Sequence, residues 1–260
     1  MVMGGQKRSG TYLTGLWWTL VRTDFKSRYH GTFGGFVWAL LKPLAMFFVL
    51  FSVFSFIFVS DPQYKLNLLI GLFLFDFFSE ATKTGLASLH AKGYLVSKVK
   101  FPTWIIVVAS ISNAIITLSV FVVIIAAFQS VAGHALTLES FGLFAFYLAC
   151  LATIIVAFSL ASSVVFLRYR DLNQVWDVII QAGFFVAPVV YPIGVIPERY
   201  HFYLYLWPPT AIIEFTRSVI VAGMVPTPRA HAILVIETII LLVVGSVIFR
   251  RYAPRAAEYV

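Results

Sequence analysis

Long apolar runs recur along almost the whole of this sequence and separate its short polar segments. Several of these runs approach the ~20 residues with which an α-helix crosses the hydrocarbon core of a bilayer. Only 12% of the 260 residues are charged, whereas a soluble domain carries about 25%. The sequence therefore predicts an all-α membrane protein, with one membrane domain over residues 1–260.

The first apolar segment, residues 11–29, is expected to lie along a membrane surface. Leu13, Leu16, Trp17 and Leu20 share one face of a helix over these residues. Arg22 and Lys26 lie on another face and make the segment unsuited to spanning. An amphipathic helix of this kind is typical of the interface between lipid and water.

Six apolar segments follow, and each is expected to cross the membrane. Within the second, Asp76 and Glu80 lie one helical turn apart, and carboxylates at this depth are costly unless they face protein or water. Within the first, four phenylalanines lie on one face because they are spaced four, three and four apart. They are Phe47, Phe51, Phe54 and Phe58. The six spans are expected at about 33–59, 66–83, 104–128, 141–167, 175–191 and 230–249.

The segment between the fifth and sixth spans, residues 192–228, is semi-apolar and rich in aromatic residues and proline. It is too broken to cross, so we expect two short helices that dip into the outer leaflet and return. Such backbone is stable at membrane depth only where protein or water satisfies it. Glu214 and Arg217 lie three residues apart and are expected to pair on the second short helix.

The basic residues predict the orientation of the chain. With six spans, the side that holds both termini carries thirteen Lys and Arg residues outside the spans, and the other side carries four. Cytoplasmic loops are enriched in Lys and Arg, so both termini are expected in the cytoplasm. The same bias explains the net charge of +8 without any nucleic acid partner.

Several common sites are absent from the sequence. It has no G-x-x-x-x-G-K-[ST] motif, so no P-loop for a nucleotide is expected. It has neither a Cys/His cluster of the kind that holds a metal nor a G-x-S-x-G hydrolase motif. We expect no catalytic site, no metal and no cofactor in this chain.

Four groups of motif residues carry a likeness to a known family. In chain order they are Asp24, Lys26, Arg28-Tyr29, Gly31, Gly35, Trp38 and Pro43; then Leu95, Lys98 and Phe101-Pro102; then Tyr169-Arg170-Asp171, Pro188-Val189-Val190-Tyr191-Pro192 and Pro197-Glu198; and finally Pro208, Glu214 and Arg217. With these, residues from about 11 to 250 resemble the membrane-spanning permease subunits of bacterial ABC polysaccharide exporters. These exporters serve O-antigen, capsule and teichoic acid. One residue departs from the pattern, because Trp207 precedes Pro208 where the family usually has asparagine.

The resemblance implies a type-2 ABC exporter permease in the bacterial inner membrane. Two copies would form a channel at their interface. Two separate nucleotide-binding subunits would bind ATP and Mg and supply hydrolysis. A lipid-linked glycan would enter from the inner leaflet, among membrane lipids.

The resemblance also implies roles for particular residues. The lipid pyrophosphate would be recognised by Lys26, Arg28, Tyr29 and His30, although Lys26 and Arg28 also fit a simple positive-inside bias. The ATPase would dock on the 84–103 loop at His90, Ala91, Lys92, Gly93, Tyr94 and Leu95. A second docking element would be Arg168, Tyr169, Arg170 and Asp171, for which an ordinary solvated turn is the alternative.

Aromatic rings would line the glycan path, since sugar C–H faces lie well against flat rings. The implied residues are Phe47, Phe51, Phe54, Phe58, Phe184, Phe185 and Tyr191. The alternative is that these rings face lipid or pack between helices.

Two other functions fit the sequence less well. One is a related permease that exports a small drug or lipid. The other is a membrane enzyme acting on polyprenyl phosphate, for which Asp76 with Glu80 is the sole candidate acid site.

Overall fold

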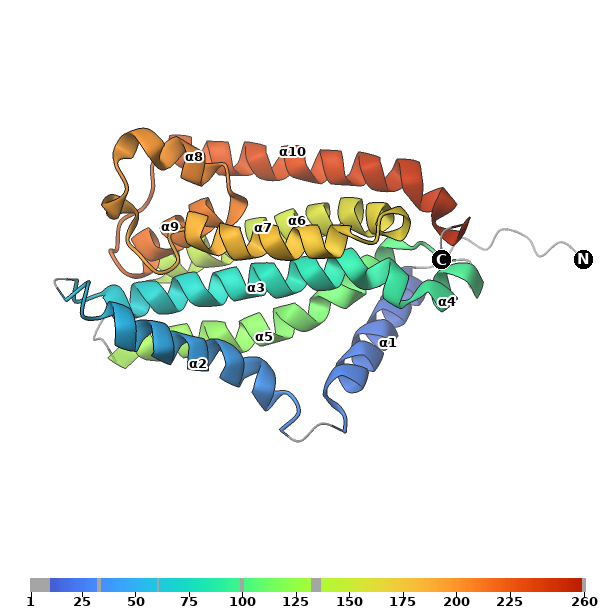
Figure 1. Cartoon of the computed structure of the whole chain (residues 1–260), viewed down its shortest axis with the longest axis horizontal. Coiled ribbons are helices and arrows are strands. Elements are labelled where there is room, and N and C mark those ends of the chain that lie inside the picture. Colours follow the sequence, from blue (N-terminus) through green and yellow to red (C-terminus); the bar gives the residue numbers. More distant parts are fainter. Residues whose placement is uncertain (1–9, 32–33, 60, 99–100, 132–136, 259–260) are drawn as a thin grey trace, which may run out of the picture.

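The computed structural model describes residues 10–31, 34–59, 61–98, 101–131 and 137–258, and every regular element in these ranges is helical (Figure 1). The α-helices are α1 (Gly10–Tyr29), α2 (Val37–Phe54), α3 (Tyr64–Ala91), α4 (Gly93–Lys98), α5 (Trp104–Val131), α6 (Leu138–Arg168), α7 (Leu172–Val186), α8 (His201–Tyr205), α9 (Pro208–Ile220) and α10 (Pro228–Tyr252). The 3₁₀-helices are η1 (Ile193–Val195), η2 (Glu198–Tyr200) and η3 (Ala253–Glu258). The all-α prediction is confirmed.

Four helices in the described ranges are long and apolar enough to cross a membrane, namely α2, α5, α6 and α10. The predicted second and fifth spans correspond to α3 and α7, which differ from these four. α3 has 28 residues but carries Asp76, Glu80 and Lys83. α7 has 15 residues, which at ~1.5 Å per residue falls short of the ~30 Å hydrocarbon core.

Several helices have other bounds than the spans predicted over them, for local reasons. α3 continues to Ala91 instead of ending at 83, because Leu86 and Leu89 extend its buried face. The first part of the predicted 84–103 loop is therefore helical. α7 ends at Val186 instead of 191, since the residue before Pro188 is disfavoured in a helix. The predicted first span begins at residue 33, which lies outside the described residues, and α2 ends at Phe54 instead of 59.

α3 forms the centre of the bundle. All residues from Leu68 to Phe75 are buried, so this part of the helix is covered on all sides. It packs against α5, α6, α9, α2 and α7. Figure 1 shows α3, α5, α6, α7 and α10 along the long axis, with α4 and η3 at one end and α8 and α9 towards the other.

The predicted interfacial segment is helical and forms α1, whose apolar face packs against another helix of the bundle. The predicted apolar face of α1, extended by Val21, packs against Ile105 and Ala109 of α5. Arg22 and Lys26 are exposed on another face. α1 and α2 meet at a sharp turn in which Gly31, Gly34 and Gly35 have positive φ, a conformation that favours glycine.

Candidate functional site

Two ion pairs join α1 to Glu80 of α3 and to Lys92 just after α3, and a hydrogen bond joins Lys92 to α5. Arg28 donates from Nη1 to Oε1 of Glu80, and from Nη2 to the Thr84 hydroxyl at 3.3 Å. Lys92 pairs with Asp24 and donates to the Ser110 hydroxyl at 2.8 Å. α1 is therefore held to the bundle by charge as well as by apolar packing.

The predicted pyrophosphate residues share this region but have different environments. Lys26, Arg28 and His30 are exposed, while Tyr29 is half-buried. The Tyr29 ring contacts Phe25 at 4.9 Å and Phe36 at 5.3 Å between centroids. Arg28 is already paired with Glu80. A phosphate that binds through Arg28 must share its guanidinium with Glu80 or displace Glu80 from it.

The predicted docking residues run from the last turn of α3, which holds His90 and Ala91, into the short helix α4, which begins at Gly93. Tyr94 is 74% exposed, whereas Gly93 is buried and Leu95 packs partly against the core. His90 and Ala91 are exposed, and the His90 ring lies edge-on to Phe166. Lys92 is turned towards Asp24 instead of solvent. The second predicted element is a turn with four exposed residues, Arg168, Tyr169, Arg170 and Asp171.

The predicted ring-lined path divides into rings that pack inside the chain and rings that do not. Phe47 is 1% exposed and stacks on Phe51, which stacks in turn on Tyr64 of α3. Phe54 and Phe58 are half-buried against the core. The channel role of these rings stays a prediction. Among the other three, Phe184 and Tyr191 are half-buried and Phe185 is 71% exposed.

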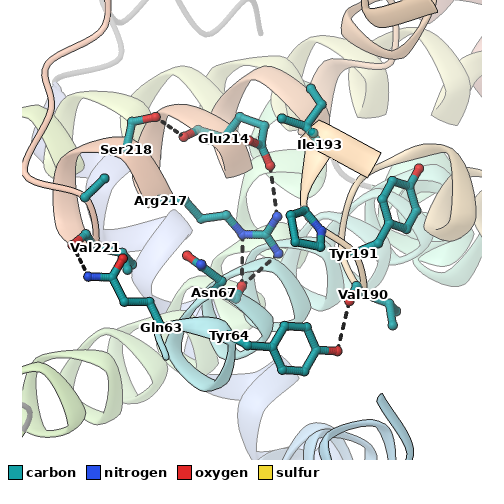
Figure 2. A pocket seen from close by; sticks show the side chains of 13 residues that line it. Gln63, Tyr64, Asn67, Val190, Tyr191, Ile193, Glu214, Arg217, Ser218 and Val221 are labelled. Carbon is teal, nitrogen blue, oxygen red and sulfur yellow. Dashed lines mark hydrogen bonds and ion pairs between the residues drawn. The ribbon is translucent and has the colours of Figure 1, made fainter. Parts of the chain in front are cut away.

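The predicted pair on the second short helix is present and belongs to a larger network (Figure 2). Arg217 of α9 is 7% exposed and bonds Oε1 of Glu214 at 2.9 Å. Its guanidinium also donates to the carbonyl oxygens of Asn67, Pro188 and Val189. Burial lowers the pKa of Arg217, and the Glu214 carboxylate opposes that shift.

Sequence reasoning missed the partners of these charges. Glu80 is 52 residues from Arg28, Asp24 is 68 from Lys92, and Asn67 is 150 from Arg217. A further ion pair joins Lys83 of α3 to Asp177 of α7 at 2.7 Å. No local spacing signals pairs of this kind. The unusual presence of charges inside apolar segments was the only hint that partners exist.

A metal site and an enzymatic acid pair find little support in the described residues. Within them, no group of three or more His, Cys, Asp and Glu side chains is placed to hold a metal ion. Glu80, half of the candidate acid pair for a membrane enzyme, is bound to Arg28.

Comparison with known proteins gives relatives along nearly the whole chain. O-antigen export system permease proteins RfbA are 26% identical over 250 residues in Klebsiella pneumoniae and 24% over 252 in Myxococcus xanthus. The former match covers 95% of both chains, and the latter covers 94% of this chain and 95% of the relative. The polysialic acid transport protein KpsM of Escherichia coli is 22% identical over 221 residues, 83% of this chain and 85% of that protein.

The sequence pattern of one family matches most of the chain. It is described as the ABC-2 type transporter and matches residues 15–221, which run from α1 to the end of α9. Together with four apolar helices of spanning length, this match identifies a multi-pass membrane protein. The chain belongs to the ABC-2 type transporter family.

Proposed function

We propose that this chain is the permease subunit of an ATP-driven exporter that moves a lipid-linked polysaccharide across the bacterial inner membrane. The observation that carries the proposal is its end-to-end similarity to permeases named for O-antigen export and to a polysialic acid transport protein. The glycan is of the O-antigen, capsule or teichoic-acid kind. The chain is a transport permease and not an enzyme.

The exporter contains two copies of this chain and two nucleotide-binding subunits, which bind ATP and Mg. Two charges within α3 support a spanning role, since Glu80 pairs with Arg28 of α1 and Lys83 pairs with Asp177 of α7 instead of facing lipid. In this arrangement α3 and α7 complete a set of six spans, and α8 and α9 are the re-entrant helices of the outer leaflet. Both termini lie in the cytoplasm.

In this orientation α4 and the 168–171 turn face the nucleotide-binding subunits. The exposed ring of Tyr94 on a short helix suits a docking contact, because aromatic residues are enriched at such interfaces. The exposed Lys26, Arg28 and His30 lie at the same end and suit the phosphates of a lipid-linked glycan.

Reconstitution tests the proposal. The chain is co-expressed with its nucleotide-binding subunit and placed in liposomes with a fluorescent lipid-linked glycan, and ATP-dependent transfer of the glycan is measured. We expect transfer in the presence of ATP and Mg, and loss of surface polysaccharide when the gene is deleted. If no nucleotide-binding subunit co-purifies, the proposal fails. Normal surface polysaccharide with increased drug sensitivity on deletion would favour a small-molecule exporter instead.

A matched pair of variants tests the docking contact. Tyr94→Ala on α4 should lower the stimulation of ATPase activity by the permease. Tyr200→Ala removes an exposed tyrosine from η2, at the α8 end of the chain, and should leave this stimulation unchanged. Equal effects of the two variants would argue against docking through α4.

A further inference from the structure

A pocket of about 190 Å³ with both polar and apolar walls lies where three separate segments meet (Figure 2). Its walls come from the start of α3, from residues 190–194 and from the C-terminal part of α9 with the residues that follow it. At ~30 Å³ per water molecule, the pocket has room for a single small ligand. Its polar side chains are Gln63, Tyr64, Asn67, Tyr191, Glu214, Arg217 and Ser218.

The guanidinium and hydroxyl donors of this pocket are already used by the protein. Arg217 makes five hydrogen bonds, one for each of its N–H groups. Tyr64 donates to Val190 O at 2.9 Å, and Tyr191 donates to Phe185 O at the same distance. An anion such as phosphate would therefore find no free cationic donor here.

Acceptor oxygens, in contrast, remain available. Gln63 donates from Nε2 to Val221 O at 3.3 Å, which fixes its amide and leaves Oε1 without a partner among the described residues. Asn67 donates from Nδ2 to Asp61 and likewise keeps Oδ1. Glu214 accepts from Arg217 through Oε1 only, within the part of the chain that the structure describes.

The charge and the shape of the pocket decide which kind of hydrogen-bond-donating ligand fits these acceptor oxygens. Arg217 neutralises Glu214, so the pocket offers little net attraction to a cation. The two amides can each give and accept hydrogen bonds, as a sugar hydroxyl does. Val190, Pro192, Ile193 and the tyrosine rings supply apolar walls for the C–H faces of a sugar.

We propose that this pocket binds one neutral sugar residue through hydroxyl groups that donate to Gln63, Asn67 and Glu214. The proposal rests on the proposed function, in which the pocket lies at the outer end of the permease. It is distinct from the ring-lined path, since it holds a glycan unit by fixed hydrogen bonds instead of letting it slide. A sugar leaving the membrane would pause there.

Ligand-observed NMR on the full permease in nanodiscs, bound to its nucleotide-binding subunit, tests the proposal. The probes are the methyl glycosides of glucose, galactose and mannose, their per-O-methylated derivatives, choline and inorganic phosphate. We expect at least one methyl glycoside to bind with a millimolar Kd and its per-O-methylated form not to bind. Equal binding of both forms, binding of choline or phosphate alone, or no binding at all would overturn the assignment.

Three variants locate the site. Gln63→Met and Asn67→Leu keep the size of the side chain but remove an amide, and each should weaken glycoside binding about three- to tenfold. The matched control is Gln129→Met. Gln129 of α5 makes a similar bond, to Ile220 O at 2.6 Å near the same end of α9, but it does not line the pocket. Glycoside binding that falls equally in the control would overturn the site.

Transport measured on the same preparations separates the two proposals. Glycan transfer without any glycoside binding would reject the sugar subsite and leave the export function standing. Glycoside binding without ATP-driven glycan transfer would reject the export function and leave the sugar-binding pocket standing.

Discussion

Arg217 joins three segments that are distant in the sequence. Its guanidinium reaches from α9 to Asn67 O on α3 and to the carbonyls of Pro188 and Val189 after α7. The Pro188 carbonyl has no helical donor, because Pro192 lies four residues on and has no N–H. Arginine supplies the missing donors, and its planar fork serves several carbonyls at once. One residue thus stabilises the break between α7 and η1.

Removing this side chain should be among the most damaging single changes. Arg217→Met leaves Glu214 and three carbonyl oxygens without their donor, and breaking a buried ion pair costs about 3–5 kcal/mol. Arg217→Lys should cost less but still destabilise, since an ammonium has fewer donors in a different geometry. The measurement is the temperature at which half of the protein loses monodisperse elution in detergent.

The control for this prediction is Arg199→Met. Arg199 is exposed and lies over the Tyr200 ring at 4.8 Å, so its loss should change the temperature little. If Arg217→Met were as stable as this control, the network around Arg217 would not support the fold.

The contact between α10 and α6 likewise depends on a single residue, Gly245. A Cβ placed on it would lie 2.2 Å from Ala157 O, which is backbone and cannot move away. Small residues let membrane helices approach closely, and this one brings α10 against α6. We expect Gly245→Val to destabilise by at least about 1–3 kcal/mol, the usual cost of overpacking.

The matched variant is Gly142→Ala on α6. A Cβ there meets nothing within 4 Å. Its stability in the same elution assay should be unchanged or raised by up to about 1 kcal/mol. If the Gly245→Val protein lost monodisperse elution at the same temperature as the wild type, α6 and α10 would not need this close approach.

At the scale of elements, the contacts of α1 distinguish it from a helix held by lipid alone. Its apolar face packs on α5, and two ion pairs, Arg28 with Glu80 and Asp24 with Lys92, fix it to the neighbouring end of α3. The side chains of the first pair are 33% and 29% exposed, and those of the second are 14% and 21% exposed. The more buried pair is screened less by salt and should contribute more.

Breaking both ion pairs should loosen α1 without unfolding the bundle. An exposed pair contributes about 0.2–1 kcal/mol, so Arg28→Gln with Asp24→Asn should speed amide hydrogen exchange in α1 several-fold. Exchange in α10 should not change, because it is separate from these contacts. Arg22→Gln is the control on the same helix, since Arg22 is exposed and makes no ion pair within the described residues. Unchanged exchange in the double variant would mean that apolar packing alone holds α1.

The helices also show which elements the hydrophobic pattern of the sequence was able to predict. Periodicity predicted α1, α5 and α6 within a few residues, because long apolar runs leave a membrane chain few alternatives to helix. It misjudged the end of α3, where the sequence changes from apolar to mixed but the helix continues on buried Leu86 and Leu89. A change from apolar residues to a mixture of apolar and polar residues is a better sign of where a helix leaves the membrane than of where the helix ends.

At the scale of the whole molecule, burial separates an inner group of helices from an outer one. The apolar stretches of α5 and α6 are 44% buried, whereas those of α2 and α10 are 11% and 22% buried. α2 and α10 therefore present large apolar faces to their surroundings. These faces are available to lipid and to the second copy of the chain in the proposed dimer.

Single-cysteine labelling tests the proposed orientation. The native Cys150 is buried and is first replaced by alanine. An impermeant maleimide added to spheroplasts should label Met224→Cys, which is 65% exposed near the α9 end. It should not label Tyr94→Cys or Tyr169→Cys until the cells are broken, since both lie on the proposed cytoplasmic side. Labelling of positions 94 and 224 from the same side would contradict six spans.

The sequence by itself determined the class of the protein and the contacts between residues that are close along one helix. Apolar runs predicted a helical membrane protein because lipid forces backbone groups to pair within a helix. Local spacing was enough to predict the amphipathic face of α1 and the pair between Glu214 and Arg217, since these groups are within one or two turns of each other.

Only the tertiary structure decided which charges meet and where a pocket forms. Glu80 finds Arg28, Lys83 finds Asp177 and Asn67 receives Arg217 because packing around α3 brings distant segments within hydrogen-bond reach. The free oxygens of Gln63 and Asn67 became visible only when the partners of their amides were known. A sequence states that a buried charge needs a partner, but the choice of partner is made by the shape of the bundle.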